Sequence, residues 1–208
     1  MTIIIGISGG VASGKNFVSK CFIEFGAKIF DADLEVSKIF SGDNYFYESI
    51  QKTFPYCILD NKIDKSLLAE RVFEDRNKLK ILESIIHPIV SCKVDKFINN
   101  CKIQNIPITL LNIPLLFEKE SYKKCDLAIL VICDLNSRKD RFIRREKVKN
   151  KKISDQSLSN KFDNIIINQK TDEEKKKLAN AVIYNDSDQE HVIFQIKLIL
   201  KNYEDNNC

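Results

Sequence analysis

The chain has 208 residues, of which 44% are hydrophobic and 30% are charged. This composition fits one globular domain, or one core with insertions, and excludes a collagen, a coiled-coil array and a chain with long disordered tails. The 33 basic and 29 acidic residues leave a net charge of +4, which by itself does not argue for nucleic-acid binding. The seven cysteines include no Cys-x-x-Cys pair, so the sequence predicts reduced thiols in a cytoplasmic protein.

Short apolar segments alternate with segments of helical periodicity along the whole chain. The expected strands are residues 2–7, 27–30, 108–113, 127–133 and 181–184. The expected helices are residues 14–25, 34–40, 45–54, 65–73, 75–86, 89–98, 137–147, 158–167 and 189–202, with a turn around Pro55 and Asp60-Asn61 and a break at His87-Pro88. This order predicts an α/β fold, a parallel sheet flanked by helices. The longest apolar stretch, residues 106–117, is too short to span a membrane.

Glycine is scarce except in one segment, where four of the six glycines fall between Gly6 and Gly14. Residues 9–16 read GGVASGKN and lie between an expected strand and an expected helix, so they fit the phosphate loop G-x-x-x-x-G-K-[ST] except at the last position. The alternative is a glycine turn that binds nothing. The predicted nucleotide-binding residues in this segment are Gly9, Gly10, Val11, Ala12, Ser13, Gly14, Lys15, Asn16 and Phe17.

Each residue type in this loop has a chemical reason. Glycines let successive backbone N–H groups turn towards phosphate oxygens, and Lys15 would bring a positive charge to the β- and γ-phosphates of ATP. A Ser or Thr hydroxyl normally ligates Mg²⁺ after the lysine. Asn16 occupies that position, and its side-chain oxygen would be a weaker magnesium ligand.

Two carboxylates follow the second expected strand, which we expect to lie beside the phosphate-loop strand. Asp31 and Asp33 are two positions apart and share a face on an extended chain. Ligands of parallel sheets bind at the carboxyl ends of the strands, where a carboxylate could take a proton from an attacking hydroxyl or hold Mg²⁺ through water. Asp33 is the favoured catalytic residue, and the alternative is that it caps the next helix.

Four of the six arginines lie within eight positions. Arg138, Arg141 and Arg145 share one helical face and Arg144 lies beside them, in a segment (138–152) with nine basic and two acidic residues, net +7. Because arginine binds phosphate and stabilises a transferring phosphoryl group, the cluster predicts a lid that closes on ATP. The alternatives are a solvated basic face and an RNA-binding patch, which the scarcity of aromatic residues disfavours.

Three further residues carry weaker signals. His87 is more typical of a helix cap or a core than of a catalyst. Glu118 follows a strand at the expected active edge of the sheet, where a plain surface carboxylate is the alternative. Asn185 follows the last strand, at a place where a nucleotide base could be read.

Taken in order, these segments resemble the dephospho-coenzyme A kinase family over about residues 3–200. The matching segments are IGISGGVASGK (5–15), FDAD (30–33), RVF (71–73), LESIIHPIV (82–90), IPLLFE (113–118), Arg141-x-x-x-Arg145, Gln169 and VIYN (182–185). The chain departs from the family pattern in having Asn16, Asn112 and Asn180, the last two where an acidic residue is common.

The resemblance implies one P-loop kinase unit (1–208). Its nucleotide-binding core would be 1–33, about 106–136 and 165–208, with an acceptor-binding helical region at about 34–90 and a lid at about 137–164. ATP would be the phosphoryl donor with Mg²⁺, and Asp33 would activate the ribose 3′-hydroxyl of dephospho-coenzyme A. The catalytic residues would also include Lys15 and the lid residues Arg141 and Arg145, while Arg71, His87 and Glu118 would line the acceptor side.

Other functions remain open on the sequence. They are another small-metabolite or nucleoside monophosphate kinase, and a catalytically weakened nucleotide- or RNA-binding P-loop protein, which Asn16 favours. We expect a small-molecule substrate as the partner, with no membrane and no nucleic acid, and the sequence leaves the oligomeric state open.

Overall fold

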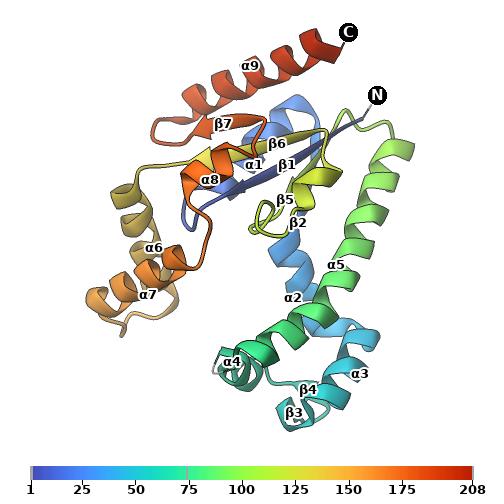
Figure 1. Cartoon of the computed structure of the whole chain (residues 1–208), viewed down its shortest axis with the longest axis vertical. Coiled ribbons are helices and arrows are strands. Elements are labelled where there is room, and N and C mark those ends of the chain that lie inside the picture. Colours follow the sequence, from blue (N-terminus) through green and yellow to red (C-terminus); the bar gives the residue numbers. More distant parts are fainter. Residues whose placement is uncertain (1, 74, 208) are drawn as a thin grey trace. The chain divides into compact units, whose positions relative to one another are not determined.

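A five-stranded parallel sheet lies at the centre of one of the two units into which the chain divides (Figure 1). The computed structural model describes residues 2–73 and 75–207. The sheet unit comprises Met1–Phe30 and Cys101–Cys208, and the helical unit comprises Asp31–Asn100.

The strand order of the sheet is β2-β5-β1-β6-β7. Its strands are β1 (Ile3–Gly9), β2 (Ala27–Asp31), β5 (Ile108–Asn112), β6 (Leu127–Ile132) and β7 (Ala181–Tyr184). The expectation that the second strand lies beside the phosphate-loop strand is wrong, because β5 lies between β2 and β1. After β1 the chain forms β2 one strand position away, and β5 later occupies the position between them.

Both faces of the sheet are covered, which explains why its strands are almost wholly apolar. The odd-numbered residues of β6 pack into a core with α1 (Lys15–Cys21) and α9 (Gln189–Asn207). The even-numbered residues of β6 pack on the other face with Leu116 and Phe117. The helix expected over residues 14–25 is α1 followed by a 3₁₀ turn (Phe22–Phe25), and Gly26 closes it at φ 77°.

The remaining helices of the sheet unit include the expected lid segment. They are η3 (Ser121–Lys124), α6 (Leu135–Lys149), α7 (Asp155–Ile167) and α8 (Asp172–Lys176). The rings of Phe142 on α6 and Phe162 on α7 are buried, with their centroids 5.5 Å apart. Residues expected to form the lid therefore pack as a helix pair.

The helical unit has a core of its own. Its elements are α2 (Ala32–Gly42), α3 (Asn44–Thr53), η2 (Pro55–Cys57), β3 (Ile58–Leu59), β4 (Lys62–Ile63), α4 (Lys65–Phe73) and α5 (Arg76–Ile103), whose end extends into the sheet unit. The sequence indicated only a turn where the short antiparallel pair of β3 and β4 lies. The buried core residues are Ile39, Phe46, Ile50, Phe54, Cys57, Leu68, Val72 and Leu82.

The expected helix break at His87-Pro88 is wrong, because Pro88 lies inside the continuous helix α5. A proline inside a helix costs about 3 kcal/mol or more. Apolar residues on both sides of it, such as Ile86 and Ile89, pack against the core of the helical unit, and this packing offsets the local cost. Figure 1 shows the axis of α5 changing direction along its length. His87 is thus an exposed residue inside a helix and caps nothing.

No helix in residues 2–73 and 75–207 combines the length and the apolar character needed to cross a membrane.

Candidate active site

The phosphate loop connects the end of β1 to the start of α1. The N–H of Ser13 donates to the carbonyl of Gly10 (3.1 Å), which closes a tight turn. Ala12 (φ 58°) and Gly14 (φ 89°) are in the left-handed region, where the chain can reverse and turn N–H groups to one side. A Cβ on Gly14 would lie 2.0 Å from Nδ2 of Asn185, so only glycine fits there.

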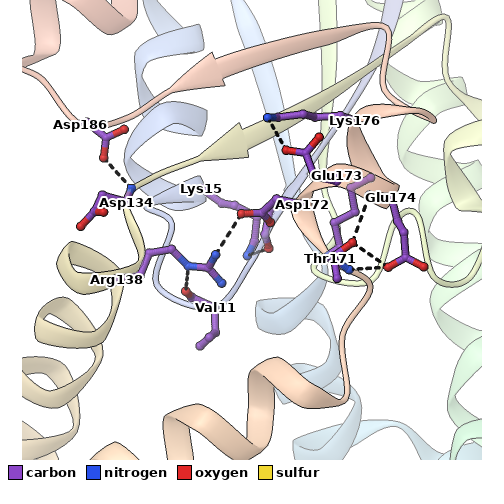
Figure 2. A network of polar contacts seen from close by, with 12 residues as sticks. Val11, Lys15, Asp134, Arg138, Thr171, Asp172, Glu173, Glu174, Lys176 and Asp186 are labelled. Atoms are coloured by element: carbon purple, nitrogen blue, oxygen red, sulfur yellow. Dashed lines mark hydrogen bonds and ion pairs between the residues drawn. The ribbon is translucent and has the colours of Figure 1, made fainter.

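Lys15 folds back across this loop. Its Nζ donates to the carbonyl of Gly9 at 2.9 Å (Figure 2). This contact holds the ammonium group beside the turn, where the motif requires a positive charge for phosphate oxygens.

Asn185 and Arg141 lie against the same loop. Asn185 is buried, and its Nδ2 donates to the carbonyl of Ser13 (2.8 Å). Nη2 of Arg141 donates to the carbonyl of Asn185 (3.1 Å). The residue that follows β7 therefore binds the phosphate loop, and it is itself bound by Arg141 of α6. The contact of Asn185 is with the loop backbone, and a role in reading the base stays a prediction.

The other arginines of the cluster differ in their surroundings. Arg145 is exposed, lies 5.5 Å above the ring of Phe142 and pairs with Glu146 (3.5 Å). Arg138 is 5% exposed and binds the loop carbonyl of Val11 through Nε (3.0 Å). The sequence placed Arg138 in the basic cluster but not among the site residues. Its shared helical face with Arg141 indicated a common direction for the two side chains, but not that Arg138 would reach the loop.

Asn16 and Asn112, two departures from the expected pattern, contact each other. Nδ2 of Asn112 donates to Oδ1 of Asn16 at 2.8 Å. The contact is possible because β5 lies beside β1, with Asn112 in register with Ile7. Asn112 is 4% exposed, and its Oδ1 has no hydrogen-bond partner among the described residues. A buried amide oxygen is thus left over at the end of the sheet where P-loop proteins hold Mg²⁺.

The third departure is structural. Oδ1 of Asn180 accepts the N–H of Ala128 at 2.7 Å. Asn180 therefore joins the segment before β7 to β6.

Glu118 is engaged by a buried lysine. Nζ of Lys175 on α8 lies 3.0 Å from Oε1 of Glu118, and the side chain of Lys175 is 1% exposed. The segment before Glu118 is held at the end of β1, because the hydroxyl of Ser8 donates to the carbonyl of Pro114 (2.8 Å). Glu118 thus belongs to the sheet unit, together with Lys15 and Arg141.

The other expected site residues belong to the helical unit. Asp31 is the N-cap of α2 and accepts the N–H of Leu34 at 3.1 Å. The alternative in which Asp33 is the cap is wrong, because Asp31 caps the helix. The expectation that Asp31 and Asp33 share a face of an extended chain is also wrong, because α2 begins at Ala32. Asp33 is exposed in the first turn of α2. Arg71 on α4 and His87 on α5 are also exposed.

Cys133 directly follows β6 and is buried. Burial and then a hydrogen bond with Asp186 raise the pKa of this thiol to about 11, although the nearby Arg141 opposes the shift. The thiol is therefore protonated near neutral pH, and a protonated thiol does not attack.

Comparisons with known proteins point to one family. The family model described as Dephospho-CoA kinase (CoaE) matches residues 3–191. A Dephospho-CoA kinase from Fusobacterium nucleatum is 37% identical over 197 residues, which cover 93% of this chain and 95% of that protein. One from Bartonella henselae is 34% identical over 205 residues, covering 96% and 99%.

Solved structures share the fold. A crystal structure of a protein from Thermus thermophilus has a TM-score of 0.78 and 27% identity, covering 97% of each chain. A Dephospho-CoA kinase from Campylobacter jejuni has a TM-score of 0.66 and 22% identity, covering 99% of this chain and 100% of that one. The phosphate loop, its position in the sheet and the match over residues 3–191 lead to one assignment: the chain belongs to the dephospho-CoA kinase family.

Proposed function

We propose that this chain transfers the γ-phosphoryl group of ATP to the ribose 3′-hydroxyl of dephospho-CoA. Phosphorylation of dephospho-CoA to CoA is the reaction of its family. The observation that carries the donor side is the phosphate loop, with Lys15 across it and Arg141 bonded to Asn185, which in turn bonds to the loop. The test is release of ADP with dephospho-CoA as the acceptor, with the new phosphate located on the product by phosphorus NMR.

The protein would act by positioning the reactants and neutralising charge. Loop N–H groups and Lys15 bind the phosphates of ATP, and Arg141 and Arg145 stabilise the charge on the transferring group. Asp33 takes the proton of the 3′-hydroxyl as that oxygen attacks. Exposure of Asp33 in the first turn of α2 supports this role.

On the acceptor side we propose Arg71, His87 and Glu118. Arg71 and His87 are exposed on α4 and α5, where an anionic acceptor could reach a cation and an imidazole. Glu118 would act while held by Lys175, since that ion pair fixes the direction of its carboxylate.

Magnesium would be held by the amide oxygens of Asn16 and Asn112. When bound it would neutralise charge on the β- and γ-phosphates. Their chemistry fits this ion, because Mg²⁺ takes oxygen ligands and usually keeps several waters and substrate phosphates. The partnerless Oδ1 of Asn112 supports the assignment. Among residues 2–73 and 75–207, no group of three or more His, Cys, Asp and Glu side chains could hold a metal.

Restoring a charged site should lower the magnesium requirement. We expect the double variant Asn16→Thr/Asn112→Asp to half-saturate at a magnesium concentration on the order of tenfold lower than the wild type, because ligand charge raises the affinity for hard cations. Asn16→Thr alone should gain less, since it leaves the amide of Asn112 without its partner. The measurement is a magnesium titration of the initial rate at saturating ATP. Equal half-saturation in the wild type and the double variant would show that the amide pair is no handicap.

The RNA-binding alternative lacks an aromatic platform on α6, the helix that carries the arginine cluster. Phe142 is the aromatic residue of α6, and it is 2% exposed, so bases could not stack on it. We propose neither a nucleic-acid nor a membrane partner. We propose a cytoplasmic location, which the free cysteines at positions 21, 57, 92, 101, 125 and 133 support.

A further inference from the structure

The backbone at Ala12, directly after the Val11–Ala12 peptide, has an unusual conformation. Ala12 has a φ of 58° without being a glycine. The left-handed region costs an L-residue roughly 1–2 kcal/mol, and such a conformation persists only where its surroundings hold it. Some contact must therefore stabilise this part of the phosphate loop.

Arg138 makes that contact. Its Nε donates to the carbonyl of Val11 (3.0 Å), and its Nη1 pairs with Oδ2 of Asp172 (3.2 Å). Figure 2 shows the side chain reaching from α6 to the loop, with Asp172 of α8 on its other side. The side chain of Arg138 is 7% exposed and that of Asp172 is 29% exposed. One guanidinium thus joins the loop to a carboxylate that fixes its direction.

The loop is built for this approach. A Cβ on Gly10 would lie 2.0 Å from Nη2 of Arg138, so the guanidinium packs against bare backbone. Lysine could not replace it, because an ammonium lacks the planar fork that serves two acceptors at fixed directions.

The contact has a consequence for phosphate binding. In a trans peptide the C=O and the following N–H point in opposite directions, and no peptide of the described residues is cis. When Arg138 holds the carbonyl of Val11 on one side, the N–H of Ala12 points to the other side. That N–H is one of the loop donors available to a phosphate oxygen.

We propose that Arg138 is a positioning residue for phosphoryl transfer, which holds the Val11–Ala12 peptide so that the N–H of Ala12 faces the phosphates of ATP, and that Asp172 orients its guanidinium. The proposal rests on the assignment of ATP to this loop. Arg138 acts through the backbone, which distinguishes it from Lys15 and Arg141.

The test measures ATP affinity by calorimetry, together with the KM values for ATP and dephospho-CoA. Arg138→Gln should weaken ATP binding about tenfold, the effect of losing a charged hydrogen bond, and leave the KM for dephospho-CoA unchanged. Asp172→Asn should give a smaller loss in the same direction. Lys139→Gln is the matched control: this neighbouring cation pairs with Asp163 at the surface, and its loss should change none of the three constants.

Rescue by glycine separates positioning from packing. Glycine adopts a positive φ without cost, so Ala12→Gly combined with Arg138→Gln should recover most of the lost ATP affinity. If the double variant binds ATP as weakly as Arg138→Gln, or if both Arg138→Gln and Asp172→Asn bind as wild type does, the proposal is overturned. If Arg138→Gln does not fold, Asp172→Asn takes its place in the test. The proposal is then overturned if Asp172→Asn binds ATP as wild type does, or if adding Ala12→Gly to it recovers none of the lost affinity. Lys15→Ala separates the assignment of ATP to this loop from the positioning role of Arg138. If Lys15→Ala abolishes transfer while Arg138→Gln has no effect, only the positioning role is wrong.

Discussion

Asp33→Asn is expected to lower turnover by roughly 10²–10⁴-fold, the usual contribution of a positioned general base. The amide keeps the shape of the side chain but cannot accept the proton of the 3′-hydroxyl. ATP binding should be nearly unchanged, because the groups assigned to the phosphates of ATP are the loop, Lys15 and the arginines of α6. The measurements are single-turnover phosphoryl transfer and a nucleotide titration.

Asp31→Asn is the matched control for this change. Asp31 is the N-cap of α2, and asparagine is as good a cap as aspartate, so both melting temperature and turnover should stay near wild type. Asp33→Asn removes a negative charge from the first turn, which is worth about 0.3–1 kcal/mol of stability. If transfer by Asp33→Asn stays within a few-fold of wild type, Asp33 is not the base, and the proton acceptor must be sought elsewhere.

Lys15→Ala should abolish most of the activity and preserve the fold. Losing one well-placed charge contact to the transferring group costs roughly 10²–10³ in rate. Lys15 also donates a hydrogen bond to the carbonyl of Gly9. Gly9 ends β1, which is paired with a strand on each side, so the fold should survive the loss of this bond. Turnover and thermal melts measure the two effects.

Lys20→Ala serves as the control for Lys15→Ala, because Lys20 is an exposed cation on the same helix α1. It should leave turnover unchanged. Equal turnover in Lys15→Ala and Lys20→Ala would contradict the assignment of the phosphate loop.

Local pattern predicted most elements of this fold. The helix over 65–73 and the strand over 181–184 agree with α4 and β7, because periodicity, caps and turn residues are encoded nearby in the chain. The break expected at Pro88 did not occur, since packing in the helical unit outweighs the local preference of proline. Strand order was also missed, because it depends on where a distant segment inserts.

In the candidate site, too, local features could be predicted from the sequence and contacts between distant segments could not. The phosphate loop and Lys15 could be predicted because their spacing is local and their flanking elements are regular. The contact of Asn16 with Asn112 could not, since it requires β5 to lie beside β1. Nor could the inward direction of Arg138, because the docking of α6 decides which arginine of the shared face reaches the loop.

The most direct test of the assigned reaction is a coupled ADP-release assay of the purified protein with a panel of acceptors. The panel contains dephospho-CoA, AMP, CMP, dTMP and shikimate, each at the same concentration with saturating ATP and magnesium. The account predicts that dephospho-CoA is phosphorylated on its ribose 3′-hydroxyl, with ADP release far above that of any other acceptor. Faster release with one of the other acceptors, or none above the acceptor-free rate with dephospho-CoA, would contradict it.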